Sequence, residues 1–238
     1  MHVHLPKPLH GWREFAGEVG IIVLGVLIAL GAGQLVELVN QRNEAAQADD
    51  IIRGELAYNL GRLQSRLQIR SCVDERISEI ERLLDRAATQ PRLQHPIWIG
   101  RPQYWTLQSS RWDAESQAGH AALIDRRELA EYGFTYALMR DTENEMMLEQ
   151  TDWAKLRMLE RLQRLDEPTL ADLNGAVQDA RYRAWRVALI SSEISAGANE
   201  LKLGAIPNSS PATRSVCYPI NTTREEANRI SRLPFGEP

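Results

Sequence analysis

The residues best suited to chemistry lie in one short stretch of the sequence. Ser109 and Ser110 precede Asp113, and His120 follows seven residues later. A serine, an imidazole and a carboxylate form a hydrolytic triad when they are in hydrogen-bond contact. The strained G-x-S-x-G turn that presents the serine in many hydrolases does not occur in the sequence. We therefore expect no catalytic residues here and predict that the protein is not an enzyme.

Metal and cofactor motifs are also missing. No Glu-x-x-His pair of the kind that binds two irons in helical bundles occurs, and the cysteines do not form a C-x-x-C motif. His2 and His4 stand close to the N-terminal amine, where a loose leader is the simpler interpretation. The glycines near position 30 lie in an apolar run without the strand and helix of a phosphate loop. We expect neither a metal nor a cofactor.

The two cysteines, Cys72 and Cys217, lie far apart in the sequence. An even number of cysteines suits one disulfide if the domain lies outside the cytoplasm. Two unlinked thiols are the alternative, and the sequence leaves both readings open.

Four large aromatic residues gather in an irregular segment, residues 90–124, which prolines and a glycine interrupt. They are Trp98, Tyr104, Trp105 and Trp112. Long ordered loops often carry function, so these side chains could form a binding surface. The alternative is that they close the end of a helical bundle, because large rings contribute strongly to core burial.

Composition limits the classes of partner. The chain is 43% hydrophobic and 25% charged, which is typical of a folded protein, and its net charge is −4. A protein that binds nucleic acid through phosphate contacts needs a basic surface, so we expect no nucleic-acid partner.

An apolar segment near the N-terminus predicts a membrane anchor. Residues 19–36 carry no charge, and as a helix they would span roughly 27 Å, close to the hydrocarbon thickness of a bilayer. We assign residues 1–16 to a leader and 17–39 to a transmembrane helix. A cleavable signal peptide is the alternative, but the basic residues before the segment are offset by acidic ones.

Small residues recur along one side of this predicted span. Gly25, Ala29 and Gly33 are spaced four residues apart, and Gln34 is the neighbouring amide. Small side chains let a second helix approach closely in lipid, so this stripe predicts packing against another membrane helix, with an unpaired anchor as the alternative. The distribution of lysine and arginine leaves the orientation nearly balanced, and we expect the N-terminus inside and the large domain in the periplasm.

The rest of the chain predicts an all-α domain, residues 40–204, of about three long helices. Leucine and isoleucine at helical spacing predict one helix over residues 40–89, with a phase slip at Cys72. Asp125 begins a second, expected to reach about Leu165 with a bent or solvated middle, and a third runs from about 170 to 201 with Gly204 as its cap. We expect these helices to form an up–down–up bundle with an extended, proline-rich tail, residues 205–238.

Two segments resemble a known family. The run from Pro6 to Gln34, PKPLHGWREFAGEVGIIVLGVLIALGAGQ, and the SRWD stretch from Ser110 to Asp113 are similar to a family of uncharacterised bacterial single-pass membrane proteins. The resemblance implies a bacterial inner-membrane location and a helical domain, and it supplies no site residues.

These observations predict a membrane-anchored, non-enzymatic helical protein that acts as a scaffold or accessory subunit of a larger membrane assembly. Its partners would be membrane lipid and other membrane-protein subunits or a second copy of itself. The alternative is an extracytoplasmic domain that senses or binds a ligand.

Overall fold

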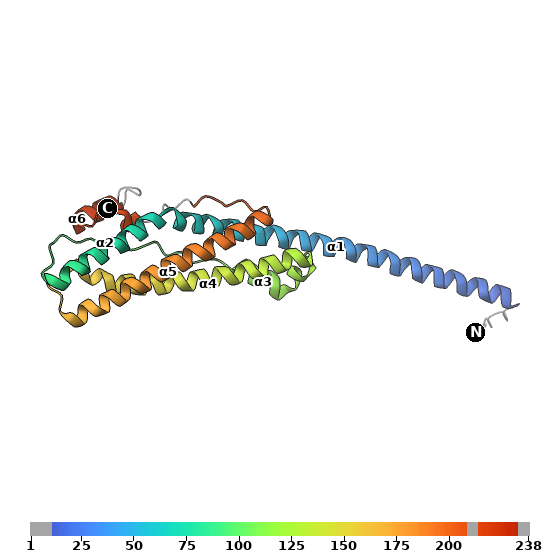
Figure 1. The fold of residues 1–238 in the computed structure, drawn as a ribbon. Helices are drawn as coiled ribbons and strands as arrows, with labels where there is room; N and C mark the ends of the chain where they lie inside the picture. Colours follow the sequence, from blue (N-terminus) through green and yellow to red (C-terminus); the bar gives the residue numbers. More distant parts are fainter. Residues whose placement is uncertain (1–10, 209–213, 233–238) are drawn as a thin grey trace, which may run out of the picture.

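The computed structural model describes residues 11–208 and 214–232 (Figure 1). Ten residues of the predicted leader, including His2 and His4, lie outside the described residues. The described chain is helical without a β-strand, and this confirms the all-α prediction. Helix α1, Trp12–Gln68, spans both the predicted anchor and most of the next predicted helix. Its 57 residues extend about 85 Å.

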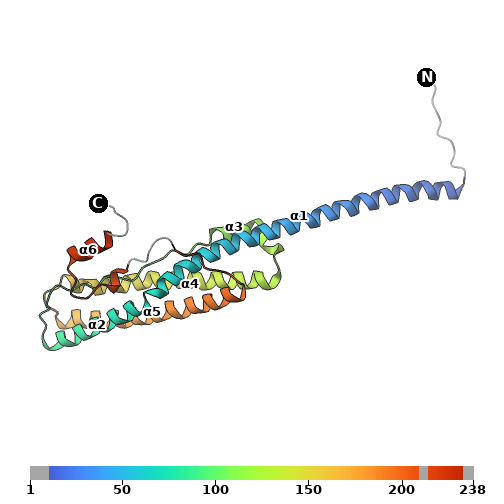
Figure 2. The same ribbon diagram turned by 90° about the horizontal axis from the view of Figure 1, so that it is seen from above.

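The N-terminal part of α1 projects away from the rest of the protein (Figures 1 and 2). None of its most apolar stretch is buried, and α1 is long and apolar enough to cross a membrane. The helix starts at Trp12, inside the predicted leader, and continues without interruption into the bundle. The predicted anchor and the first predicted helix of the domain are therefore one continuous helix.

Helix α1 ends at Gln68, and α2, Arg70–Thr89, begins after a break at Ile69. The interruption predicted at Cys72 thus lies three residues earlier. Ile69 is buried, and its N–H bonds to the carbonyl of Arg66 at 3.4 Å, as in a tightened final turn. The phase of the buried stripe changes at this point, so the chain turns there while it keeps its apolar side inward.

The segment after α2 is only partly irregular. Residues 90–109 are extended, but α3, Ser110–Ala118, and a 3₁₀ turn, η1, His120–Leu123, follow. The expectation of an irregular connection through residue 124 is therefore wrong from residue 110 onward. The extended part runs back along the bundle, with Asn59 of α1 holding both the N–H and the carbonyl of Gln108.

Helix α4, Arg126–Leu156, begins where the sequence predicted. The carboxylate of Asp125 accepts bonds from the N–H groups of Arg127 and Glu128 at 2.9 and 3.4 Å, which caps the helix. Its end differs, because a 3₁₀ turn, η2, Arg157–Glu160, replaces the helix predicted to reach Leu165. The middle is a continuous helix with Glu149 and Asp152 buried on one side, and Asp141, Asn144 and Thr151 are exposed on the other.

Helix α5, Glu167–Glu200, carries the predicted apolar stripe on its buried side. The carboxylate of Asp166 caps it by accepting a bond from the N–H of Thr169 at 3.0 Å. The sequence predicted Gly204 as the C-terminal cap, and this prediction is wrong. The helix ends at Glu200 with Leu201 as its C-cap, and Lys202 takes the left-handed conformation with φ 55°. The predicted tail contains a short turn, η3, Arg214–Cys217, and a helix, α6, Arg224–Arg232.

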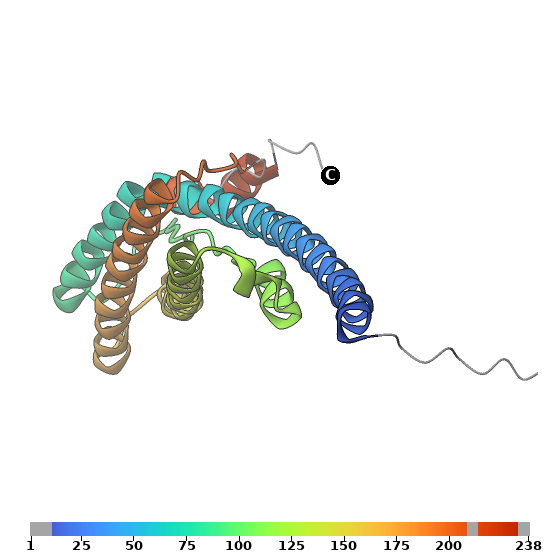
Figure 3. The same ribbon diagram turned by 90° about the vertical axis from the view of Figure 1, so that its right-hand side faces the viewer.

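The predicted up–down–up order is wrong, because α1 and α4 run parallel. Their contacts ascend together along both helices: Asp49 meets Tyr132, Glu55 meets Tyr136, and Arg66 meets Glu149. The extended segment 90–109 makes the return that an antiparallel helix was expected to make. Figure 3 shows α1 and α2 arching over α4, with α5 and α3 on its two sides.

The buried side chains form two apolar clusters along the bundle. One lies toward the anchor and includes Ile52, Leu63 and Met146. The other lies beyond the break in α1 and includes Ile69 and Trp153. Polar side chains occupy the level between the two clusters. This level lies between Leu63 and Ile69 on α1 and between Met146 and Trp153 on α4.

Candidate functional site

A buried carboxylate organises the region of the SRWD stretch. Glu55 of α1 is 1% exposed and faces the N-terminus of α3. It accepts bonds from the N–H groups of Arg111 and Trp112 at 3.0 and 3.2 Å, and from the Tyr136 hydroxyl at 2.8 Å. A carboxylate at this place satisfies backbone donors and is favoured by the helix dipole. Burial, with Glu55 as hydrogen-bond acceptor, raises the pKa of Tyr136, so its hydroxyl stays a donor.

A buried ion pair fills the polar level between the two apolar clusters. Arg66 and Glu149 are 3% and 0% exposed, and their closest atoms, Nη2 and Oε1, are 2.7 Å apart. Beside them, Arg183 of α5 bonds to Asp152 at 2.9 Å. Burial raises the pKa of Glu149, and the Arg66 charge opposes that shift. Three helices therefore meet at one charged layer.

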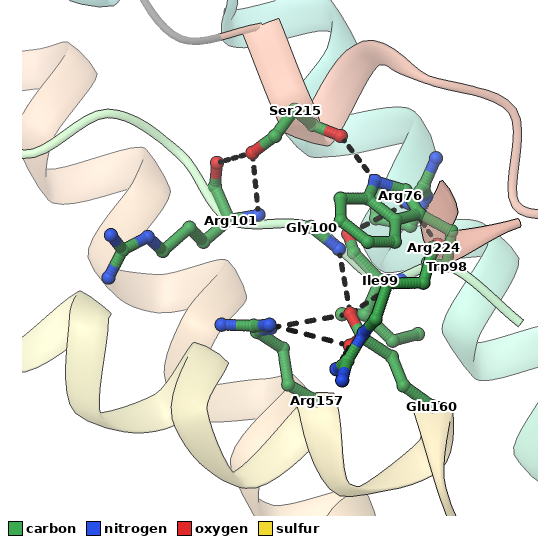
Figure 4. A network of polar contacts seen from close by, with 9 residues as sticks. All are labelled: Arg76, Trp98, Ile99, Gly100, Arg101, Arg157, Glu160, Ser215 and Arg224. Atoms are coloured by element: carbon green, nitrogen blue, oxygen red, sulfur yellow. Dashed lines mark hydrogen bonds and ion pairs between the residues drawn. The ribbon is translucent and has the colours of Figure 1, made fainter. Parts of the chain in front are cut away.

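A third polar network fixes the far end of the bundle (Figure 4). The Arg76 guanidinium donates to the carbonyls of Trp98, Ile99 and Tyr218 and to the Glu79 carboxylate. These contacts join α2 to the extended segment and to the tail.

Glu160 completes this network from η2. Its carboxylate accepts bonds from the N–H groups of Ile99 and Gly100 at 3.2 and 3.3 Å, and it pairs with Arg157 and Arg224. The Trp98 indole donates to the carbonyl of Ser215 at 2.8 Å. These groups bond to one another, so the network holds α2, the extended segment, η2 and the tail together. We call this network the clasp.

The two cysteines lie in this region and are joined. Cys72 of α2 and Cys217 of η3 form a disulfide, with their Cα atoms 4.9 Å apart. Both are partly buried and pack against the apolar cluster beyond the break. The bond ties the tail to the start of α2.

The four aromatic residues of the predicted loop do not form one patch. Trp98 is buried and stacks on Tyr218, with ring centroids 6.4 Å apart. Trp112 stacks on Tyr136 at 5.0 Å. Tyr104 and Trp105 are partly buried against the cluster near the anchor. The rings lie along the side of the bundle and are buried or partly buried there. Their contacts resemble those of core residues more than those of a single exposed binding surface.

The predicted small-residue stripe lies on the projecting part of α1. Gly25, Ala29, Gly33 and Gln34 are all exposed, and no atom lies within 4 Å of a Cβ built on either glycine. The stripe faces open space, so a second helix could approach it.

The groups imagined as a hydrolytic triad are not assembled. The Ser109 hydroxyl bonds to Asp113 at 2.9 Å, while His120 bonds to Glu115 at 3.0 Å. Ser110 lies near Glu55. Among the described residues, no group of three histidine, cysteine or acidic side chains could hold a metal ion.

Several shallow cavities indent the surface. One of about 300 Å³ is lined by Arg101, Tyr104, Gln150 and Ser215. Another, of about 360 Å³, lies between α1 and the adjacent ends of α4 and α5, and Arg53 and Lys202 are among its mostly charged lining residues. The Ser215 hydroxyl in the first cavity is buried and donates to the carbonyl of Arg101 at 3.0 Å.

Comparison with known proteins gives no match: no family model, no curated protein and no solved structure is similar to this chain. The polar residues that organise the bundle were also missed by sequence reasoning. A signal for Arg66 was present, because it follows Leu63 by three residues on the apolar side of the helix.

Proposed function

We propose that the protein is an inner-membrane protein whose helical domain stands in the periplasm and serves as a scaffold or accessory subunit. The observation that carries this proposal is the exposure of the apolar part of α1. Ile21, Leu24, Ile28 and Leu35 are each at least 58% exposed. Burying such side chains is worth about 1.5–3 kcal/mol each, so a rod of them in water would be strongly disfavoured. A bilayer removes that cost.

A structural role for the domain follows from how its polar groups are used. Glu55, Arg66, Arg76 and Glu160 each bind partners within the chain. Side chains committed in this way position elements, whereas a catalytic group must reach a substrate. The unbroken α1 would hold the domain at a fixed angle to the membrane, which suits a protein that presents surfaces to other subunits.

The test is alkaline carbonate extraction followed by protease treatment of spheroplasts. We expect the full-length protein in the membrane pellet, because the apolar helix would be embedded in lipid. We expect protease added outside to digest the domain, and intact cells to protect it. Full-length protein in the carbonate supernatant would refute the anchor, and protection in spheroplasts would reverse the orientation.

A ligand-binding role is the second candidate, and the cavity beside Arg101 favours it. Its volume of about 300 Å³ lies at the low end of small-ligand sites. Such sites are mostly enclosed, however, and this one opens to the surface and is lined by Pro102 and Tyr104 together with polar side chains. Thermal stabilisation by a periplasmic small molecule, lost in Gln150→Trp, would favour this candidate.

A further inference from the structure

The solvent-facing side of α5 has a centre without charge. Exposed residues follow one another there at spacings of three, four or seven: Ala171, Gln178, Tyr182, Trp185, Leu189 and Ala196. We call this set the α5 outer face. The solvent side of α2 is different, because Asp74, Glu75, Arg82 and Asp85 are exposed on it. Spacings of three and four are those with which one helix packs along another.

Large apolar side chains occupy the middle of the α5 outer face. Tyr182, Trp185 and Leu189 are 54%, 51% and 45% exposed, and the two rings lie 5.9 Å apart. Single exposed apolar residues are ordinary, but a contiguous patch indicates an interaction surface. Tryptophan and tyrosine are also the residues that most often dominate binding energy at protein interfaces.

Two arginines that flank this patch are paired within the chain, and Glu193, one helical turn beyond Leu189, is exposed. Arg181 pairs with Glu81 of α2, and Arg186 pairs with Glu145 of α4 at 3.4 Å. In a symmetric pair of parallel α5 helices, each of these arginines would lie near the same arginine of the second copy. Their internal pairing reduces the repulsion that unpaired like charges would cause.

The direction of α5 decides which partner fits, and this step rests on the proposed membrane anchor. Figures 1 and 2 show α5 lying along the long axis of the bundle, in the direction in which α1 projects. Two copies anchored in one membrane point the same way and are related by an axis along the membrane normal. Their α5 helices would then meet in parallel, each residue near its own copy. The middle of the α5 outer face carries no charge, so it tolerates this arrangement.

We propose that the α5 outer face binds the same face of a second copy, forming a parallel dimer with Trp185 at its centre. The contact adds a helix to the exposed side of the bundle and removes the patch from water. The small-residue stripe of α1 lies outside this interface and stays available to another membrane helix.

The test is crosslinking of the full-length protein in membranes through one introduced cysteine. The native cysteines are joined to each other, so the new thiol is the reactive one. Ala196→Cys on the α5 outer face keeps Trp185 and should give a covalent dimer with a short bismaleimide, because the two copies of residue 196 adjoin. The matched control is Met147→Cys on α4, 53% exposed in the native protein, which should stay at background.

A second variant keeps the test independent of the chemistry of crosslinking. Trp185→Glu would set two carboxylates against each other, so we expect loss of the dimer in native mass measurement with an unchanged melting temperature. Equal crosslinking of both cysteine variants, a monomer, or a covalent product with a different protein would overturn the proposal. A monomer that remains in the carbonate pellet refutes the dimer alone, whereas extraction into the supernatant refutes the anchor.

Discussion

At the scale of single residues, long polar side chains set the register between α1 and α4. Glu55 bonds to Tyr136 at 2.8 Å, and Asn59 lies 3.4 Å from the sulfur of Met139. Arg66 and Glu149 add a charged contact at the next level. Buried charges lose hydration, so they are tolerated only when paired, and a shift of one helix along the other would unpair them.

Replacing Arg66 tests this at the residue scale. Arg66→Met would leave Glu149 buried without its partner, which typically costs about 3–5 kcal/mol, and urea denaturation would measure the loss. The pKa of Glu149 is already raised by burial and would rise further. The folded variant would then hold a proton more tightly than the unfolded chain. Its stability should therefore increase as the pH falls through the folded-state pKa toward the ordinary carboxyl range.

The control for this prediction is the double replacement Arg66→Met with Glu149→Leu. It removes both charges and fills the level with apolar atoms, so most of the lost stability should return. Wild-type stability in Arg66→Met alone would show that the ion pair does not lie in the core.

At the scale of elements, helix boundaries set by neighbouring residues were predictable, and boundaries set by packing between elements were not. The start of α4 depends on Asp125, which bonds to N–H groups two and three residues ahead, so the signal is local. The break at Ile69 and the end of α4 at Leu156 depend on packing between elements. Helix α3 was missed because the group that caps it, Glu55, lies 55 or more residues earlier in the chain.

At the element scale, replacing each of two glycines with alanine should change the stability in opposite directions. A Cβ on Gly61 of α1 would lie 1.8 Å from the carbonyl oxygen of Ile206, whereas one on Gly175 of α5 would meet nothing within 4 Å. Gly61→Ala should push the segment after α5 off α1 and destabilise the domain by about 1–3 kcal/mol. Gly175→Ala should stabilise it by about 0.5–1 kcal/mol, because alanine favours a helix. Thermal melts of both would decide, and a stabilised Gly61→Ala would contradict the close approach.

At the scale of the whole molecule, the class was predictable and the connectivity was not. The charge-free run and the helical spacing predicted an all-α chain with an apolar N-terminal helix. The parallel arrangement of α1 and α4 depends on contacts such as Arg66 with Glu149, 83 residues apart. Helical spacing says which side of a helix is buried but not which helix covers it, so an antiparallel order was the simpler expectation.

The disulfide between Cys72 and Cys217 gives the last prediction. The disulfide joins residues separated by 145 positions, and closing a loop of that size restricts the unfolded chain, for which about 2–5 kcal/mol is typical. Cys217→Ser should lower the free energy of unfolding by this amount, and dithiothreitol should lower that of the native protein similarly. Among the described residues of the tail, only Val216 is fully buried in the adjoining cluster, so the bundle should remain folded without the bond. Limited proteolysis should then remove α6 first. Equal stability with and without dithiothreitol, together with an unchanged cleavage pattern, would show that the clasp around Arg76 holds the tail unaided.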